Sequence, residues 1–171
     1  MPAAQTPAVH ISGDVDTDAR FAITHVATSI ANADAKAGLL AAALTFTVAA
    51  VAGQGAQIAK LIRSHSVLDG FALLAMALAV LALVVSALHV LRAVQPRVDS
   101  ADSTRFDWPS LADADVEALM AVPPAAAGRE AWLHAKQLSL IARAKFAAIA
   151  VALRWFALGG AFLLTWSFLA R

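Results

Sequence analysis

Three long apolar stretches, separated by polar segments, dominate the pattern of hydrophobic and polar positions. They cover residues 37–54, 70–91 and 147–170. The second contains no formally charged residue. As a helix rising about 1.5 Å per residue it reaches about 33 Å, which exceeds the roughly 30 Å hydrocarbon core of a bilayer. The pattern predicts an all-α integral membrane helical bundle with about three transmembrane helices.

The segments that precede the first and third stretches are amphipathic. Residues 17–36 and 126–145 repeat apolar side chains at intervals of three and four, as one face of a helix does. No glycine or proline interrupts the first segment before Gly38. We therefore predict that helices one and three run on without a break and extend from the membrane as a cytoplasmic stalk.

The remaining segments predict the domain organisation. We expect a disordered N-terminal head at residues 1–16, a single membrane domain at 17–171, and a cytoplasmic segment at 92–146. Within that segment, SLADADVEALMAV (110–122) predicts a short amphipathic helix that ends at Pro123 and Pro124. Residues 54–69 are expected to form a loop on the opposite side of the membrane.

The basic residues near the span ends predict the orientation. One side of the membrane would hold Arg20, Lys36, Arg92, Arg97, Arg143 and Lys145, and the other Lys60, Arg63 and Arg171. Cytoplasmic loops carry the excess of lysine and arginine. The N-terminus and the long loop are therefore expected in the cytoplasm.

Composition agrees with a membrane protein and excludes several other classes. Of the 171 residues 60% are hydrophobic and 15% charged, against about 25% charged in a typical soluble domain. Mean hydropathy is +0.70. A net charge of +1 argues against a nucleic-acid-binding protein. The absence of cysteine excludes disulfides, iron–sulfur clusters and cysteine-bound zinc.

No catalytic motif is present. The sequence contains no GxGxxG, P-loop, HExxH, GxSxG or EF-hand loop, and no two histidines are four residues apart. Enzymes assemble several reactive groups in one pocket, and nothing in the sequence indicates such a group. We expect no enzyme activity, no catalytic residue, no metal site and no cofactor.

Two ionisable residues, His89 and Arg154, fall inside the predicted spans. A charged side chain at the centre of a span costs on the order of 3 kcal/mol, and less near an end. Two interpretations are open. The residues anchor the helices at the interface or form polar contacts between helices, or they belong to the pore lining or gate of an oligomer. Small residues around Gly159 and Gly160 offer a surface for close helix packing.

A charged cluster lies at the mouth of the first span. Asp34 and Lys36 are two residues apart and so point in directions about 160° different on a helix. Four polar residues of helix three are expected at the same level: Gln137, Ser139, Arg143 and Lys145. If the helices are neighbours, Asp34 can pair with Arg143 or Lys145, which leaves a cation for an anionic ligand. Alternatively, all these charges only solvate the membrane surface and fix the orientation.

The order of several short strings resembles a known family. They are NADAKAGLL (32–40), LHVLRAVQPR (88–97), RFDW (105–108) and KQLSLIARAKFAAI (136–149). From residue 20 onward the chain resembles the transmembrane effectors of Pycsar, the bacterial antiphage defence system built on a pyrimidine cyclase. The most specific strings are Ala33, Asp34, Lys36 and Ala37, and then Gln137, Ser139 and Lys145. Phe146 stands where relatives often have tyrosine.

The resemblance implies a function. A partner cyclase makes cyclic UMP or cyclic CMP after infection, and the effector responds by impairing the bacterial inner membrane, so that the infected cell dies. It also implies a homo-oligomer that binds the nucleotide near the stalk. The expected ligand-binding residues are Lys36, Arg143 and Lys145 for the phosphate, and Asp34, Gln137 and Ser139 for the ribose or base.

Two other functions are compatible with the sequence. A holin-like membrane toxin would need no ligand, and an accessory subunit of a larger membrane complex would not be toxic. The long cytoplasmic segment, which a simple pore former does not require, favours sensing.

Overall fold

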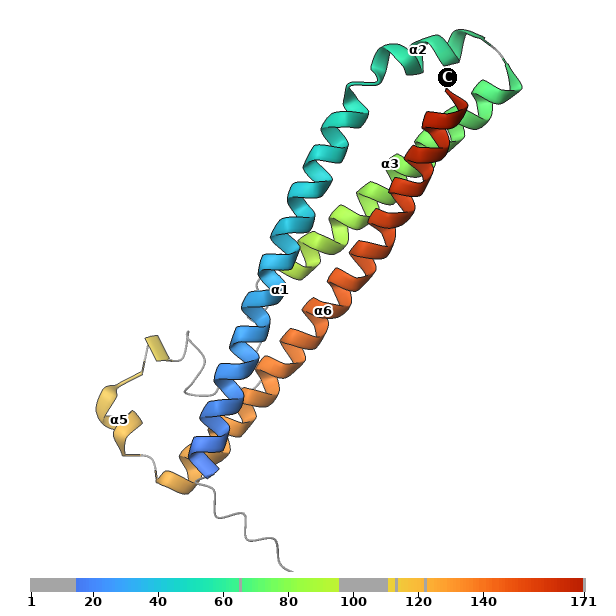
Figure 1. Cartoon of the computed structure of the whole chain (residues 1–171). Helices are drawn as coiled ribbons and strands as arrows, with labels where there is room; N and C mark the ends of the chain where they lie inside the picture. The colour runs from blue at the N-terminus through green and yellow to red at the C-terminus, as the bar shows by residue number, and fades with distance from the viewer. Residues whose placement is uncertain (1–14, 65, 96–110, 113, 122, 171) are drawn as a thin grey trace, which may run out of the picture. The chain divides into compact units, whose positions relative to one another are not determined.

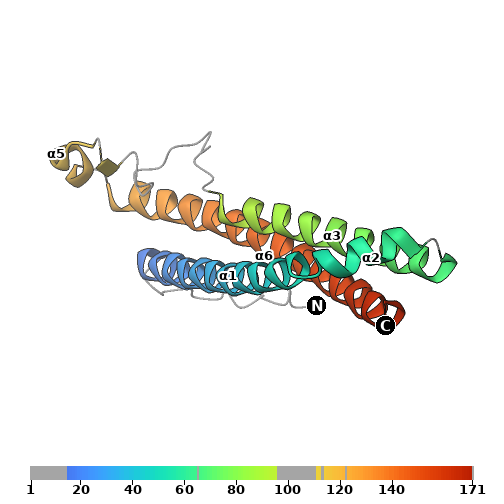
Figure 2. The same ribbon diagram turned by 90° about the horizontal axis from the view of Figure 1, so that it is seen from above.

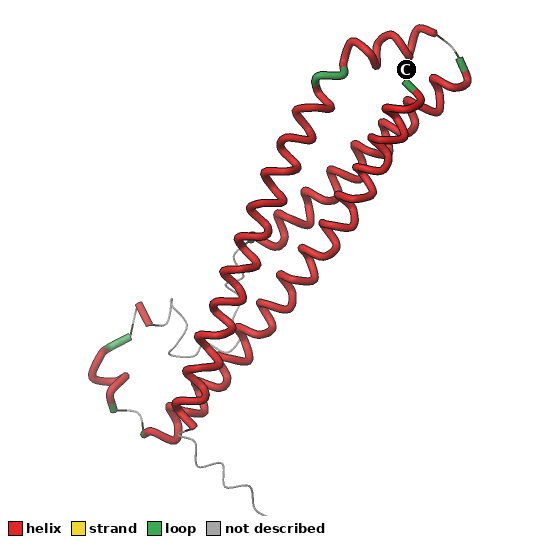
Figure 3. Tube along the Cα trace, viewed as in Figure 1, coloured by secondary structure: helices red, strands yellow, loops and turns green. Residues whose placement is uncertain are grey.

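The computed structural model describes residues 15–64, 66–95, 111–112, 114–121 and 123–170. These residues form five labelled helices: α1 (Val15–Ala52), α2 (Gly55–Ser64), α3 (Val67–Val94), α5 (Val116–Met120) and α6 (Pro124–Leu169) (Figure 1). Within the described residues there is no strand, as the tube in Figure 3 shows. The predicted all-α class is confirmed.

Three helices are long and apolar enough to cross a membrane. The candidate spans lie in Thr17–Ala52, Val67–Val94 and Ala125–Leu169, which confirms the predicted three candidate membrane helices. Their predicted bounds within these helices stay predictions. The 38 residues of α1 and the 46 of α6 correspond to about 57 and 69 Å, well beyond a roughly 30 Å hydrocarbon core. That the excess length forms a cytoplasmic stalk stays a prediction. The head at residues 1–16 lies almost entirely outside the described residues.

The chain divides into two compact units, which are described separately. Unit 1 comprises Met1–Ala27 and Asp99–Ser139, and unit 2 comprises Thr28–Val98 and Leu140–Arg171. In unit 1, Ala19, Ala131 and Ala135 are buried. Helix α5 falls inside the predicted short helix, and its N-cap Asp115 accepts a hydrogen bond from the Glu117 amide at 3.3 Å. The string RFDW lies outside the described residues.

Unit 2 holds the apolar core. On α1 the buried side chains are Ala33, Ala37, Leu40 and Leu44, at spacings of four, three and four. They pack with Leu83, Val90 and Ala93 of α3 and with Ile149 and Ala152 of α6. Spacings of three and four place these residues on one face of each helix. The core of unit 2 is therefore a narrow seam of mostly small side chains, and the opposite faces of the helices remain outside it.

Helices α3 and α6 approach closely along this seam. The Ser86 hydroxyl donates to the Ala152 carbonyl oxygen at 2.8 Å, and Ser86 is fully buried. A Cβ at Gly159 would lie 3.2 Å from Leu83 Cδ2, so glycine permits this approach. Figures 1 and 2 both show α3 alongside the C-terminal half of α6. Gly159 therefore has the predicted packing role within one chain. Gly160 does not, because a Cβ there would meet nothing within 4 Å.

The opposite end of unit 2 is closed by α2, which lies in the segment expected to be a loop. Leu61 of α2 is buried with Met76 of α3 and Trp166 of α6. The Gln57 amide donates to the Ala170 carbonyl oxygen at 2.6 Å. The expectation of a simple loop at 54–69 was wrong because Ile58 and Leu61, three apart, give one apolar face that packs on the bundle.

Candidate functional site

The charged cluster at the start of the first span makes direct contact with α6. Lys145 Nζ lies 2.5 Å from Asp34 Oδ1. Only 12% of the Lys145 side chain is exposed, whereas Asp34 is 46% exposed. Of the two partners that the sequence offered for Asp34, the structure selects Lys145. This lysine is therefore engaged, and one oxygen of the Asp34 carboxylate lies outside the pair.

Lys36 meets the same region of α6 through a different contact. Its ammonium nitrogen lies 5.7 Å from the centroid of the Phe146 ring, within the range of a cation–π interaction. Phe146 directly follows Lys145, so α6 contacts both charged residues of the α1 cluster with adjacent side chains. The contact between Lys36 and the phenyl ring is one that the sequence analysis missed, although it singled out both residues.

These two contacts lie on opposite sides of the buried seam. Ala33 and Ala37 are fully buried and occupy the face of α1 between Asp34 and Lys36. At about 100° per residue, Asp34 and Lys36 flank that face on its two sides. We call this arrangement the collar: the Asp34–Lys145 ion pair on one side, and Lys36 with Phe146 on the other. Asp34 and Lys36 point in different directions, as predicted, and both still contact α6.

Arg143 belongs to the side of the collar that contains Phe146. It lies three residues before Phe146 on α6, a spacing at which side chains share a helix face. Arg143 is exposed, and it has no ion pair within the described part of the chain. One side of the collar is therefore the neutralised Asp34–Lys145 pair, and the other is Lys36 with the partly exposed ring of Phe146. Arg143 is an exposed cation on the α6 face next to that ring.

Gln137 and Ser139 belong to unit 1, whereas the collar belongs to unit 2. The Ser139 hydroxyl donates to the Ala135 carbonyl oxygen at 2.8 Å, four residues earlier on the same helix. Gln137 is half-buried. Their predicted part in a common site with Asp34 and Lys36 stays a prediction.

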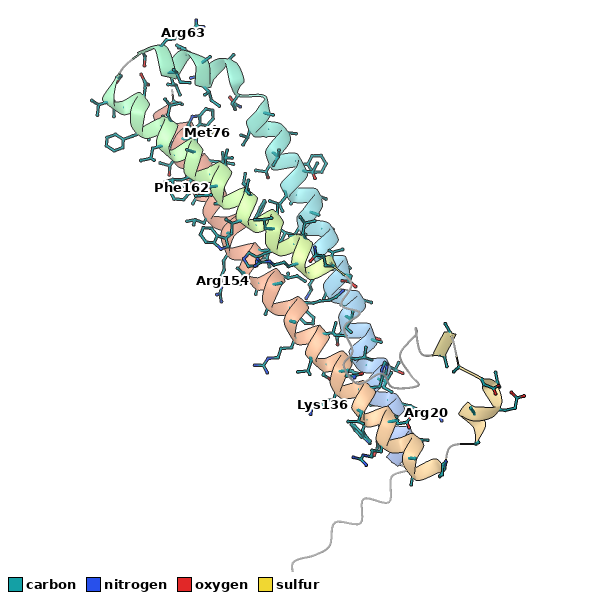
Figure 4. All side chains as sticks on the ribbon, turned by 180° about the vertical axis from the view of Figure 1, so that it is seen from behind. Arg20, Arg63, Met76, Lys136, Arg154 and Phe162 are labelled. Atoms are coloured by element: carbon teal, nitrogen blue, oxygen red, sulfur yellow. The ribbon has the colours of Figure 1, made fainter. Side chains whose placement is uncertain are left out.

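The two ionisable residues of the spans differ in their surroundings. His89 of α3 is half-buried, whereas Arg154 of α6 is exposed. Figure 4 shows the Arg154 side chain on the outer side of α6. Among residues 15–64, 66–95 and 123–170 no hydrogen bond or ion pair joins it to a partner. A polar contact that does lie inside the bundle involves Ser86, whose hydroxyl donates to the Ala152 carbonyl oxygen.

The described residues contain no group of three or more histidine, cysteine, aspartate or glutamate residues that could hold a metal ion. The collar combines an ion pair, a cation beside an aromatic face, and a carboxylate of which one oxygen lies outside the pair.

Three candidate spans and a charged collar at the start of the first and third define a helical membrane protein with charged side chains beside its spans. A profile of the PycTM family, described as the Pycsar effector protein domain, matches residues 18–171, and the chain belongs to that family. It is therefore a membrane-associated effector of an antiphage defence system whose other component is a cyclase. No curated protein and no solved structure matched the chain.

Proposed function

We propose that this effector senses a cyclic pyrimidine mononucleotide, cUMP or cCMP, made by its partner cyclase, and that it responds by impairing the bacterial inner membrane. The observation that supports the proposal is the unequal division of the collar. Lys36 and Phe146 form its cationic side, Arg143 is exposed three residues before Phe146 on α6, and the remaining lysine, Lys145, is neutralised by Asp34.

The phosphate of a cyclic mononucleotide carries a single negative charge. An ammonium group and a planar guanidinium are the side chains suited to such an anion. Lys36 and Arg143 are both exposed, which leaves them accessible to a ligand from water. Lys145 is mostly buried against Asp34, so its role in the proposed site is to hold the carboxylate and not to meet the phosphate first.

The base and ribose need different partners. Phe146 is 38% exposed and offers a ring face of about the size of a pyrimidine. When Lys36 moves from the ring to the phosphate, that face becomes available for stacking. The Asp34 carboxylate is suited to accept a hydrogen bond from the ribose hydroxyl.

Nucleotide binding at the collar would act on the spans directly because Asp34 and Lys145 lie on the same continuous helices that cross the membrane. A ligand shifts a conformational equilibrium only when it binds one state better than the other. In our proposal the N-terminus is cytoplasmic, the chain forms a homo-oligomer, and the nucleotide favours a state in which the bundle opens. His89 is the group proposed to line that opening, and Arg154 the group proposed to gate it.

The test is dye release from liposomes that contain the purified protein. The orientation of the protein in the bilayer is determined first, and cUMP, cCMP, cAMP or cGMP is then added outside the liposomes. We expect cUMP or cCMP to cause release, and Lys36→Ala and Arg143→Ala to weaken nucleotide binding by on the order of tenfold each. Lys60→Ala and Arg63→Ala, on α2, are the matched cationic controls and should behave as wild type.

Each alternative function predicts a different result. Unchanged nucleotide-induced leakage in Lys36→Ala and Arg143→Ala proteins that insert normally would falsify the assignment of the site. Leakage without any nucleotide identifies a holin-like toxin. Absence of leakage with every nucleotide, together with copurification of a larger membrane protein, identifies an accessory subunit.

A further inference from the structure

Arg154 is a charged residue in an apolar span, and the described residues give it no hydrogen-bond or ion-pair partner. It lies nine residues beyond Lys145 on α6, which at about 1.5 Å per residue is about 13 Å along the helix. Its side chain is exposed on the outer side of α6 (Figure 4). Within the helices that the structure describes, no carboxylate, hydroxyl or carbonyl accepts a hydrogen bond from it. An exposed guanidinium at this depth needs an acceptor from outside the chain.

Several side chains next to Arg154 on α6 are small. Four exposed alanines lie along its face of α6, at three, four or seven residues from it: Ala147, Ala150, Ala157 and Ala161. Val151 and Leu158 border that face on one side. Small residues allow another helix to approach closely enough for the guanidinium to reach its polar groups.

The Asp34–Lys145 contact fixes the level of Arg154 relative to α1. Helices α1 and α6 run in the same direction (Figure 1), and nine residues beyond Asp34 is Ala43. In a ring of copies around an axis normal to the membrane, every copy lies at the same depth. Arg154 of one copy is therefore level with Ala43 of the next, and Thr45 lies two residues, about 3 Å, from that level.

Thr45 is the suitable acceptor at this level. It is exposed, and its hydroxyl proton is donated to the Ala41 carbonyl oxygen at 3.0 Å, so its lone pairs face outward as acceptors. The other polar groups nearby are less accessible, since Thr47 and His89 are half-buried and Ser86 is fully buried. Thr45 also shares its helix face with the exposed Gly38 and Ala42, and nothing lies within 4 Å of a Cβ at Gly38.

We propose that the α6 face centred on Arg154 binds a second copy of this chain, at the α1 face formed by Gly38, Ala42 and Thr45, with the guanidinium donating to the Thr45 hydroxyl oxygen. The contact joins two different faces, because a two-fold contact of the α6 face with itself would set Arg154 against Arg154. Repetition of such a contact at constant depth closes a ring. This inference rests on the proposed oligomer and not on the proposed nucleotide.

The experiment uses the fact that the chain has no cysteine. Two differently tagged full-length copies are expressed together, one with Ala49→Cys and the other with Ala161→Cys, and membranes are oxidised with and without cUMP or cCMP. Ala161 lies sixteen residues beyond Lys145 and Ala49 fifteen beyond Asp34, so the two are level within one residue. We expect a mixed disulfide from this combination. Two control combinations should not crosslink. In the first, both copies carry Ala161→Cys; in the second, one copy carries Ala161→Cys and the other carries Leu81→Cys, on the exposed face of α3.

Variants then test the role of Arg154 itself. Arg154→Leu and Thr45→Val should each lower the crosslinked fraction roughly three- to tenfold, and the two together should lower it no further than one alone. Ser167→Ala is the control, because this exposed hydroxyl of α6 also donates to a carbonyl four residues earlier.

Three results would overturn the interface: no Ala49–Ala161 crosslink under any condition, equal crosslinking between two Ala161→Cys copies, or an unchanged yield in Arg154→Leu. A crosslink without nucleotide-induced leakage would support the interface and remove the proposed sensing. Nucleotide-induced leakage without the crosslink would support the proposed sensing and contradict the interface. In that case the acceptor for Arg154 would be a lipid phosphate.

Discussion

Lys145 and Asp34 form an ion pair between α6 and α1 in which the lysine is largely buried and the aspartate is half exposed, at an Nζ–Oδ1 distance of 2.5 Å. The pair lies directly beside the fully buried Ala33 and Ala37, where α1 meets the core of unit 2. It therefore joins α1 and α6 at the level of the collar.

Loss of Asp34 should destabilise the protein more than loss of an ordinary surface carboxylate, since it leaves the buried Lys145 ammonium without its counter-charge. We expect Asp34→Ala to lower the free energy of unfolding by about 1 kcal/mol, measured by thermal unfolding in detergent. The control is the charge exchange Asp34→Lys with Lys145→Asp, which should recover part of the loss. If the exchanged protein is no more stable than Asp34→Ala, the ion pair does not hold the helices together.

The phenyl ring of Phe146 is expected to matter through its π face. Phe146→Tyr keeps that face and should preserve both stability and nucleotide binding. Phe146→Leu keeps the apolar contact and loses the interaction with Lys36, at a cost of about 0.5–1 kcal/mol. The measurement is nucleotide affinity by titration in detergent, alongside thermal unfolding. Equal affinities in the leucine and phenylalanine proteins would contradict a stacking role for the ring.

Hydropathy was sufficient to predict the three spans, because a continuous apolar run of this length has few alternatives to a membrane helix. It could not predict α2, whose ten residues contain two cations and whose apolar face becomes visible only when Leu61 packs beside Met76 and Trp166. Short amphipathic segments of this kind are indistinguishable from polar loops by average hydropathy.

Within the collar, the sequence placed Asp34 opposite two possible cations and could not choose between them. Arg143 and Lys145 are two residues apart, so only one of them can face α1, and the rotation of α6 decides which. In the structure α6 directs Ile149 and Ala152 into the core of unit 2, and at this rotation Lys145 is the cation that meets Asp34. The outward position of Arg154 follows from the same rotation.

Helix α2 should be held to the end of the bundle by a small number of contacts. Gln57→Leu removes the hydrogen bond to the Ala170 carbonyl oxygen, and Leu61→Ala removes the buried anchor. We expect hydrogen–deuterium exchange of the α2 amides to rise in both variants, and more strongly for Leu61→Ala because a buried leucine contributes about 2–3 kcal/mol. Ile62→Ala is the control, since Ile62 is 59% exposed. Equal exchange in the Leu61 and Ile62 variants would show that α2 is not anchored at Leu61.

Adjacent glycines on α6 provide a matched pair for the packing of α3 against α6. Gly159→Ala places a methyl group 3.2 Å from Leu83 Cδ2 and Cγ and 3.4 Å from the Ala79 carbonyl oxygen, so the two helices must separate or Leu83 must shift. Gly160→Ala meets nothing within 4 Å in the chain. We expect Gly159→Ala to destabilise by about 1–3 kcal/mol, while Gly160→Ala is neutral or slightly stabilising because alanine favours the helix. Thermal unfolding of the two variants in the same detergent measures the difference. If both alanines have the same effect, the close approach at Gly159 does not contribute to the stability of the bundle.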